Sequence, residues 1–189
     1  MAKPNPFWIA AISLAVLTHA SAAHAGRVIY SYDSVTPITR TMTDTGITLI
    51  LDKSLMRTRV LTLAETQTIG EADLKPASDE ALGRGGLTPL IGRDGEERDL
   101  YEISPKGDGR ALINALCPGA DKGYLAFGRI HQGEDLRVRA LGHDPATGQS
   151  RLCYTLDYAY HGQWLEPPME LPQPDRSDRF NDAPANRRF

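Results

Sequence analysis

Cysteine is scarce in this chain of 189 residues: it occurs twice, at Cys117 and Cys153. The two do not form a Cys-x-x-Cys pair and neither has a histidine beside it, which argues against a redox or nucleophilic thiol. The sequence also lacks the Gly-x-Ser-x-Gly and Ser-x-x-Lys motifs of serine nucleophiles. The glycine-rich stretch 83–86 lacks the Lys-Ser/Thr of a phosphate-binding loop. These absences exclude the commonest signatures of a small enzyme.

Long apolar runs are missing except for one, Phe7–Leu17, near the start of the chain. This run is too short to span a bilayer. It follows Lys3 and precedes the small-x-small sequence Ala23-His24-Ala25, the pattern of a secretory signal peptide. We therefore expect residues 1–25 to be a signal peptide, no transmembrane segment after its cleavage, and a periplasmic or secreted protein.

Excess positive charge is absent as well. The formal net charge is −3 and includes Lys3, so the chain after residue 25 carries about −4. An acidic, exported chain is a poor candidate for nucleic-acid binding. Export also favours oxidised cysteines, and an even pair in a small exported domain is usually a disulfide. The sequence predicts a bond between Cys117 and Cys153, which are 36 residues apart.

Strand patterns dominate the residues that follow. Alternating, β-branched runs predict strands in the first half of the chain at 27–32, 38–42, 47–51 and 57–65, with a hairpin turn at 43–46. Glycine and polar residues dominate 70–95, where one helical turn is expected at 78–82 and the glycine-rich piece 83–86, which breaks it, is expected to be a surface loop. A further strand is expected at 98–104.

One helix and a meander follow. Asp108 is the expected N-cap, Ala111, Leu112, Ala115 and Leu116 form an apolar face, and Pro118 ends the helix at Cys117. Strands are predicted at 124–130, 136–143 and 151–160. If the two turns set the register, facing residue numbers sum to about 266 in the first hairpin and about 292 in the second.

The predicted fold class is α+β and β-rich: an antiparallel sheet, either a meander, a partly closed barrel or a sandwich, with one packed helix. The sequence divides into the signal peptide 1–25, a single domain 26–165 and a tail 166–189. The tail holds five of the 13 prolines among charged and amide residues, so we expect it to be disordered.

The histidines do not predict a metal site. Only His131, His143 and His161 follow residue 25, and the meander would separate His143 from the other two by the length of a strand. A two-histidine site from His131 and His161, completed by Glu134 or Asp135, is the alternative that this spacing leaves open. Solvated turn histidines explain the pattern more simply, and we expect no metal and no cofactor.

The candidate binding residues are Arg129, Arg137, Arg139, Tyr158 and Trp164. The expected register places Arg129 opposite Arg137, with Arg139 further along the same face and Asp157 within diagonal reach. One interpretation is a surface ladder of arginines relieved by carboxylates. The other is a site for an anion or an acidic partner, because folding gains nothing from opposed like charges. Tyrosine, tryptophan and arginine are also the residues that anchor protein interfaces.

We expect, then, an exported small binding protein of the cell envelope that contacts another envelope protein or a glycan. Two alternatives stay open. One is a small hydrolase acting on cell-envelope polymers, which would require a convergent pair of carboxyl groups in a cleft. The other is a structural component of the envelope.

Overall fold

The computed structural model describes residues 26–54, 57–65 and 70–165. The predicted signal peptide, residues 1–25, and the predicted tail, residues 166–189, lie outside these ranges.

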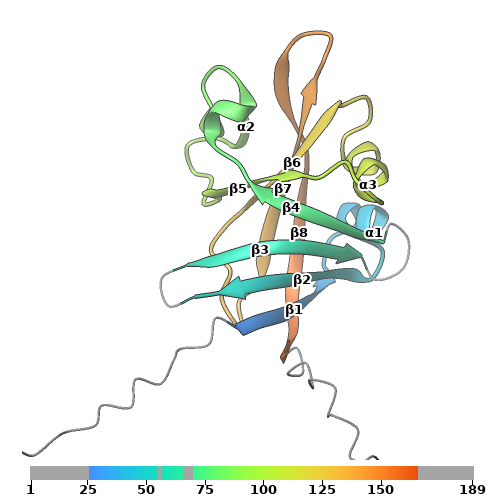
Figure 1. Cartoon of the computed structure of the whole chain (residues 1–189), viewed down its shortest axis with the longest axis vertical. Helices are drawn as coiled ribbons and strands as arrows, with labels where there is room; N and C mark the ends of the chain where they lie inside the picture. The colour runs from blue at the N-terminus through green and yellow to red at the C-terminus, as the bar shows by residue number, and fades with distance from the viewer. Residues whose placement is uncertain (1–25, 55–56, 66–69, 166–189) are drawn as a thin grey trace, which may run out of the picture.

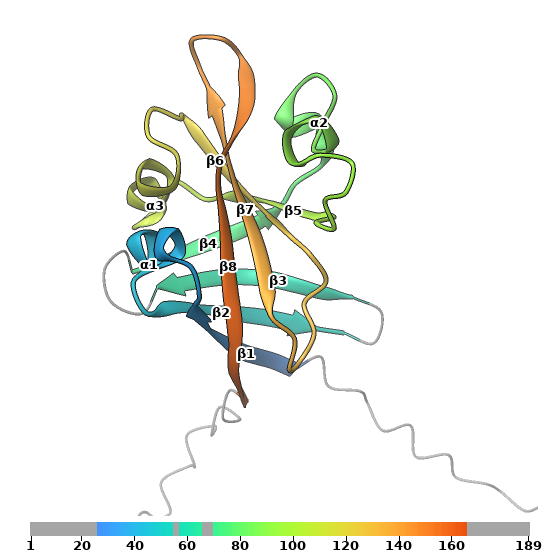
Figure 2. The ribbon, with the colours of Figure 1, turned by 180° about the vertical axis from the view of Figure 1, so that it is seen from behind.

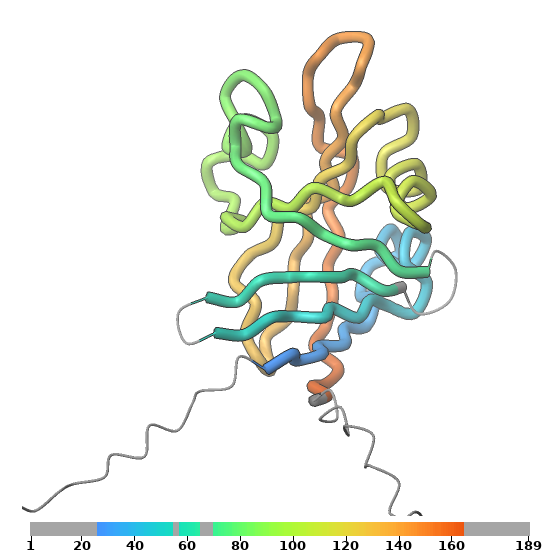
Figure 3. Tube along the Cα trace, viewed as in Figure 1, coloured from blue at the N-terminus to red at the C-terminus, as the bar shows by residue number. Residues whose placement is uncertain are grey.

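The described chain folds into a closed antiparallel β-barrel of eight strands in sequence order. The strands are β1 (Gly26–Ser34), β2 (Gly46–Lys53), β3 (Thr58–Glu65), β4 (Glu71–Pro76), β5 (Asp99–Ile103), β6 (Lys122–Phe127), β7 (Leu136–Asp144) and β8 (Gln149–Leu165). Each pairs with the next, and β8 returns to pair with β1. In Figures 1 and 3, β2, β3 and β4 run across the view while β7 and β8 run along the long axis behind them, so the two halves of the barrel cross. The predicted β-rich antiparallel fold with a packed helix is confirmed.

Large side chains fill the interior of the barrel. Alternation along β1 directs Val28, Tyr30 and Tyr32 inward, and all three are buried. Opposite strands contribute Phe127 and Val138 to the same core cluster. Because close-packed apolar side chains occupy this space, the barrel is a packed core, and surfaces for recognition lie on its outside.

The stretch 70–95 is more ordered than predicted. It contains β4, the short 3-10 helix η1 (Asp79–Leu82) and the one-turn helix α2 (Thr88–Ile91). η1, α2 and the residues between them cover the outer face of β5, β6 and β7 with a second apolar cluster: Leu82, Leu87, Leu100, Tyr124, Ala126 and Leu141. The helical turn predicted at 78–82 is present as η1, and the glycine-rich piece 83–86 is a surface loop as predicted. β4 and α2 were not predicted, because the leucines of this stretch show no period.

The predicted central helix is present as α3 (Gly109–Leu116). Leu112 and Leu116 of the predicted apolar face are buried against the main core, together with Ile113, which was not predicted. Ala115 is half-buried and Ala111 is exposed, so the face is rotated from the predicted one. Asp108 is the N-cap residue, as predicted, but its side chain makes no capping hydrogen bond.

The disulfide between Cys117 and Cys153 is present, with the two Cα atoms 5.5 Å apart. Cys117 follows α3 and is buried, and its Sγ lies where a Cβ on Gly142 would be. The bond therefore ties the end of α3 to β8, next to a position on β7 where only glycine leaves enough room.

One predicted strand is a helix. Residues 38–42 belong to α1 (Pro37–Thr43), which packs beside β8 (Figure 2). Thr36 is its N-cap and accepts a hydrogen bond from the Thr39 amide over 3.1 Å, and Pro37 occupies the first turn. A threonine cap followed by proline favours a helix start, and this local signal overrides the β-branched alternation.

Buried hydroxyl groups attach α1 to the barrel. The Thr43 hydroxyl lies 3.1 Å from the hydroxyl of Tyr158 and 3.1 Å from that of Ser34. The Thr39 hydroxyl accepts a hydrogen bond from the Asp157 amide over 3.0 Å. These bonds fix the link between β1 and α1 against the outer edge of β8.

The register of the first hairpin differs from the prediction by one residue. Phe127 lies opposite Val138, so facing residue numbers sum to 265 instead of 266. The expected register puts Leu125 and Phe127 on the face opposite to Val138. A slip of one residue moves a whole strand's side chains to the other face, so both residues share the core with Val138. In the second hairpin Leu136 lies opposite Tyr158, a shift of two residues that keeps the predicted face until the irregularity at Ala140/Leu141.

Candidate binding groove

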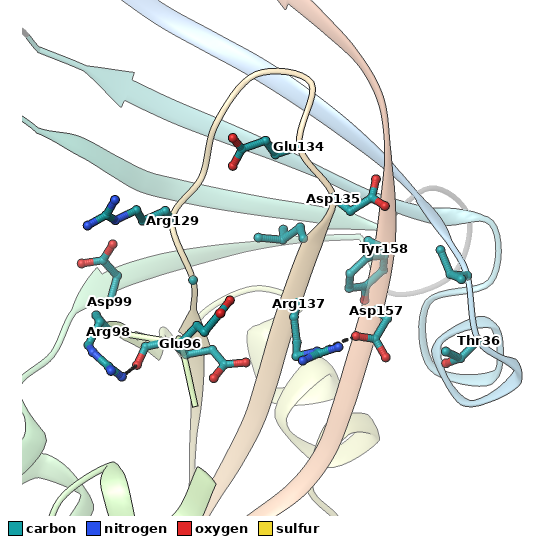
Figure 4. Close-up of a pocket in the computed structure, with 14 residues that line it drawn as sticks. Thr36, Glu96, Arg98, Asp99, Arg129, Glu134, Asp135, Arg137, Asp157 and Tyr158 are labelled. Carbon is teal, nitrogen blue, oxygen red and sulfur yellow. Dashed lines mark hydrogen bonds and ion pairs between the residues drawn. The ribbon is translucent and has the colours of Figure 1, made fainter. Parts of the chain in front are cut away.

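A groove with a volume of about 1110 Å³ lies on the outside of the barrel. Its floor is formed by β7 and β8, one wall by the link between β1 and α1, and the other wall by the segment that leads into β5. The loop between β6 and β7 closes one end (Figure 4). The lining residues are Val35, Thr36, Glu96, Glu97, Arg98, Asp99, Gly128, Arg129, Glu134, Asp135, Leu136, Arg137, Asp157 and Tyr158.

Carboxylates outnumber arginines in this lining by six to three, a formal charge of −3. The acidic residues are Glu96, Glu97, Asp99, Glu134, Asp135 and Asp157, and the basic ones are Arg98, Arg129 and Arg137. Figure 4 shows Glu134 and Asp135 on the loop above the floor, with Asp99, Arg98 and Glu96 along one wall and Thr36 on the other side. The groove is therefore charged along its length and acidic in sum.

Arg137 is paired on the floor of the groove. It lies directly opposite Asp157, and its Nε donates to Asp157 Oδ1 over 2.7 Å. The hydrogen bond and the charge of Asp157 raise the pKa of Arg137, and the nearby carboxylates Glu97 and Glu96 add to this effect. The Arg137 side chain remains 57% exposed, so the pair forms part of the accessible floor.

Arg139 and Glu97 form a second pair in the groove wall, in a far less exposed position. Arg139 Nε donates to Glu97 Oε1 over 3.0 Å, and Arg139 also bonds to the hydroxyl of Thr155. The Glu97 side chain is only 2% exposed, and its Oε2 has no hydrogen-bond partner among the residues described. A buried carboxylate oxygen without a hydrogen-bond donor lowers the free energy of unfolding. A donor that reached this oxygen would therefore stabilise the wall.

A smaller cavity of about 140 Å³ lies behind that wall, beneath α2. It is lined by Asp79, Leu87, Thr88, Ile91, Gly92, Arg93, Glu97 and Arg98. Glu97 and Arg98 line both spaces. Glu97 Oε2 lies near Gly95, where a Cβ would be 3.2 Å from it and 2.6 Å from Ile91 Cδ1. The free oxygen therefore faces the side of the wall that α2 covers.

Arg129 occupies a position that the sequence did not predict. β6 ends at Phe127, so Arg129 is exposed in the loop that follows and does not face Arg137 across a hairpin. The predicted opposition of Arg129 and Arg137 is wrong, because the pairing of β6 with β7 ends at Phe127. The relief of Arg137 by Asp157, which the ladder interpretation included, is present. Arg129 and Arg137 nevertheless line the same groove, and no ion pair of Arg129 occurs in the described part of the chain.

The two aromatic candidates are separated. Tyr158 forms part of the groove floor, but it is only 2% exposed and its hydroxyl is bonded to Thr43. The expectation that it reaches the surface is wrong. Trp164 is 57% exposed, lies opposite Ile29 near the far end of β8, and is not among the residues that line the groove. The structure therefore brings together Arg129, Arg137 and Tyr158 of the five predicted residues, with Arg139 in the wall behind them.

Neither the acidic wall nor the exposed apolar residues beside the groove were predicted from the sequence. Glu96 and Asp99 belong to a charged run that reads as a solvated loop, and they are exposed. Val35, at 48% exposure, lines the groove, and Ile38 on the adjoining α1 is 53% exposed. The charged run was visible in the sequence, but only the pairing of β5 with β6 brings it beside β7.

The histidines have other partners. His143 Nδ1 lies 2.7 Å from Asp121 Oδ1, and His161 Nδ1 lies 2.9 Å from Asp33 Oδ2. His161 thus meets an aspartate of β1 and not Glu134 or Asp135, which the two-histidine alternative would have required. Among the described residues, no group of three or more His, Cys, Asp and Glu side chains is arranged to hold a metal ion.

Comparison of the chain with protein-family models, curated proteins and solved structures finds no match. No helix in the described ranges has the length and apolar character needed to cross a membrane.

Proposed function

We propose that this protein is an exported binding protein of the cell envelope, periplasmic or secreted, and that the groove is the site at which its partner docks. The observation that carries the proposal is the position of the groove. It is a hollow on the outside of a barrel whose interior is filled by side chains, and two exposed apolar residues, Val35 and Ile38, stand at its rim.

The character of the lining favours binding over catalysis. Two of its three arginines are held in fixed contacts: Arg137 with Asp157, and Arg98 through Nη1 with the carbonyl oxygens of Gly95 and Glu97. Charged groups beside exposed apolar side chains offer a partner protein both polar and apolar contacts, and protein interfaces combine the two. The signal-like start of the chain and the cysteine pair support export.

Capture from an envelope extract, with matched variants, tests this proposal. The bait is the protein from residue 26 onward, as wild type and as the double variant Glu96→Lys, Asp99→Lys, in which both changes are on exposed groove residues. The control is Glu71→Lys at the start of β4, an exposed carboxylate that does not line the groove. A partner held by the wild type and by the control but lost from the groove variant supports the proposal. Equal retention by all three proteins would place the docking site elsewhere.

The gathering of carboxylates favours one second candidate, the small hydrolase of cell-envelope polymers. Glycoside hydrolysis uses two carboxyl groups that flank the scissile bond, and several carboxylates of this groove come from different segments of the chain. Release of reducing ends from cell-wall and glycan polymers by the wild type, and its loss in Glu96→Gln or Glu134→Gln, would establish this activity. Absence of turnover on these polymers would leave binding as the function.

A further inference from the structure

We infer that the groove recognises a basic segment of a partner protein, whose lysine or arginine side chain is held by the acidic wall while an apolar side chain rests on Val35 and Ile38. This inference rests on the proposed function and specifies the chemistry of the partner. It reverses the expectation from the sequence, in which the arginines attract an acidic partner.

The first support is the balance of charges without partners. Glu96, Asp99 and Glu134 make no side-chain hydrogen bond or ion pair within the described residues. Among the arginines of the lining, Arg137 is paired with Asp157, whereas Arg98, bonded to two carbonyl oxygens, and Arg129 keep their charges unpaired in the described part of the chain. Pairing thus leaves a surplus of carboxylates in the groove. Complementary charge steers association and suppresses partners of like charge, so this surface disfavours an acidic partner.

Glu97 does not add to this surplus. It is almost completely buried, and Arg139 neutralises it through one carboxylate oxygen. Its other oxygen has no donor within the described chain and faces the cavity beneath α2, not the groove. The attraction for a cation therefore comes from the exposed carboxylates of the groove.

The second support is the apolar rim. Val35 and Ile38 are two of the four large apolar side chains that are exposed in the described structure. Val35 is held in place because its amide donates to the Asp157 carbonyl over 3.1 Å, directly beside the floor of the groove. An exposed apolar contact next to fixed carboxylates suits a peptide that carries both basic and apolar side chains, and suits a uniform polysaccharide less well.

The test uses capped peptides and the protein from residue 26 onward. One seven-residue peptide carries two arginines and two leucines, a second has lysines in place of the arginines, and a third has glutamates there. Binding is measured by calorimetry at low and at high salt. We expect the two basic peptides to bind and the acidic one to fail, with affinity falling as salt rises.

The variants decide where the peptides bind. In Glu96→Gln, Asp99→Asn both changes remove exposed charges, and affinity for the basic peptides is expected to fall by about three- to tenfold. Glu71→Gln, the matched change on β4, should leave the affinity unchanged.

Several results would overturn the inference. They are preferential binding of the acidic peptide, equal loss of basic-peptide affinity in the β4 control and the groove variant, or binding of glycan oligomers but not of peptides. These results differ from a failure of the proposed function. A partner captured from extract and lost on the Glu96→Lys, Asp99→Lys change would keep the groove as the docking site even if its chemistry is not the one inferred.

Discussion

Arg137 on β7 lies directly opposite Asp157 on β8, and the two side chains are joined by a hydrogen-bonded ion pair of 2.7 Å. Each of the two residues also lies beside a different wall of the groove. Asp157 shares backbone and side-chain hydrogen bonds with the link to α1, through Val35 and Thr39. The charge of Arg137 is influenced by Glu96 and Glu97 on the other wall. The pair thus connects the two sides of the proposed docking site.

Replacing Arg137 with alanine is expected to change the free energy of unfolding by less than about 1 kcal/mol, because exposed ion pairs contribute little to stability. A double-mutant cycle with Asp157→Ala, measured by urea unfolding, isolates the coupling between the two side chains. A coupling energy well above about 1 kcal/mol would mean that the ion pair stabilises the packing of β7 against β8.

The pair between Arg139 and Glu97 should behave differently, because both side chains are largely removed from water. Arg139→Ala leaves the Glu97 carboxylate buried without its cation, and the expected loss is about 3–5 kcal/mol. The double replacement Arg139→Met, Glu97→Leu removes both charges and should restore most of that stability. If the double variant is as unstable as the single one, the cost comes from lost packing around α2 and not from an uncompensated charge.

The contrast between these two arginines shows what the sequence could predict. Alternation correctly puts Arg137 and Arg139 on the outer face of one strand, and a relieving carboxylate, Asp157, was expected near Arg137. The partner of Arg139 was not, because Glu97 is 42 residues away in the chain and reaches it only through the pairing of β5 with β6. Arg129 was misplaced because β6 ends two residues before it, which no local pattern shows.

Features determined within a few residues were easier to predict. Helix α3 and its stop at Pro118 lie within one short segment, and the structure has them. The stretch 38–42 was a local error: the Thr36-Pro37 sequence indicates a helix start, but β-branched alternation was given more weight. The groove needs the closure of the whole barrel, since its walls come from four separate parts of the chain, and that information is not local.

The disulfide between Cys117 and Cys153 should stabilise the fold by about 3–4 kcal/mol, the value expected for a loop of this length in the chain-entropy model. The measurement compares denaturant midpoints of the oxidised protein and of Cys117→Ala, Cys153→Ala. Thiol titration of the unfolded, unreduced wild type should find no reactive group. Two titratable thiols per chain would show that the bond does not form in the protein as produced.

Tyr32 gives a prediction about alkaline pH. Burial raises the pKa of its hydroxyl well above the ordinary value, and Tyr30, Tyr160 and Glu134 act in the same direction. A group with a raised pKa in the folded state contributes stability below its unfolded pKa of about 10 and loses it as pH rises towards the folded value. Unfolding should therefore become easier above about pH 10, and Tyr32→Phe should reduce that dependence.

The same change should cost little at neutral pH, because the Tyr32 hydroxyl has no hydrogen-bond partner among the residues described. Chemical unfolding of wild type and Tyr32→Phe at pH 7 and at pH 10.5 checks both statements. A large loss of stability at pH 7 would reveal a contact of the hydroxyl, such as a bound water, that the fold depends on.

Hydrogen exchange of the complex tests most directly the claim that the groove is where the partner docks. The captured partner is added to the protein from residue 26 onward, and backbone amide exchange is compared with that of the free protein. The account predicts slower exchange in residues 96–99, in the loop 128–135 and around Val35, with β2 to β4 unchanged. Protection confined to β2–β4, or to the surface around Trp164, with the groove segments exchanging as in the free protein, would contradict it.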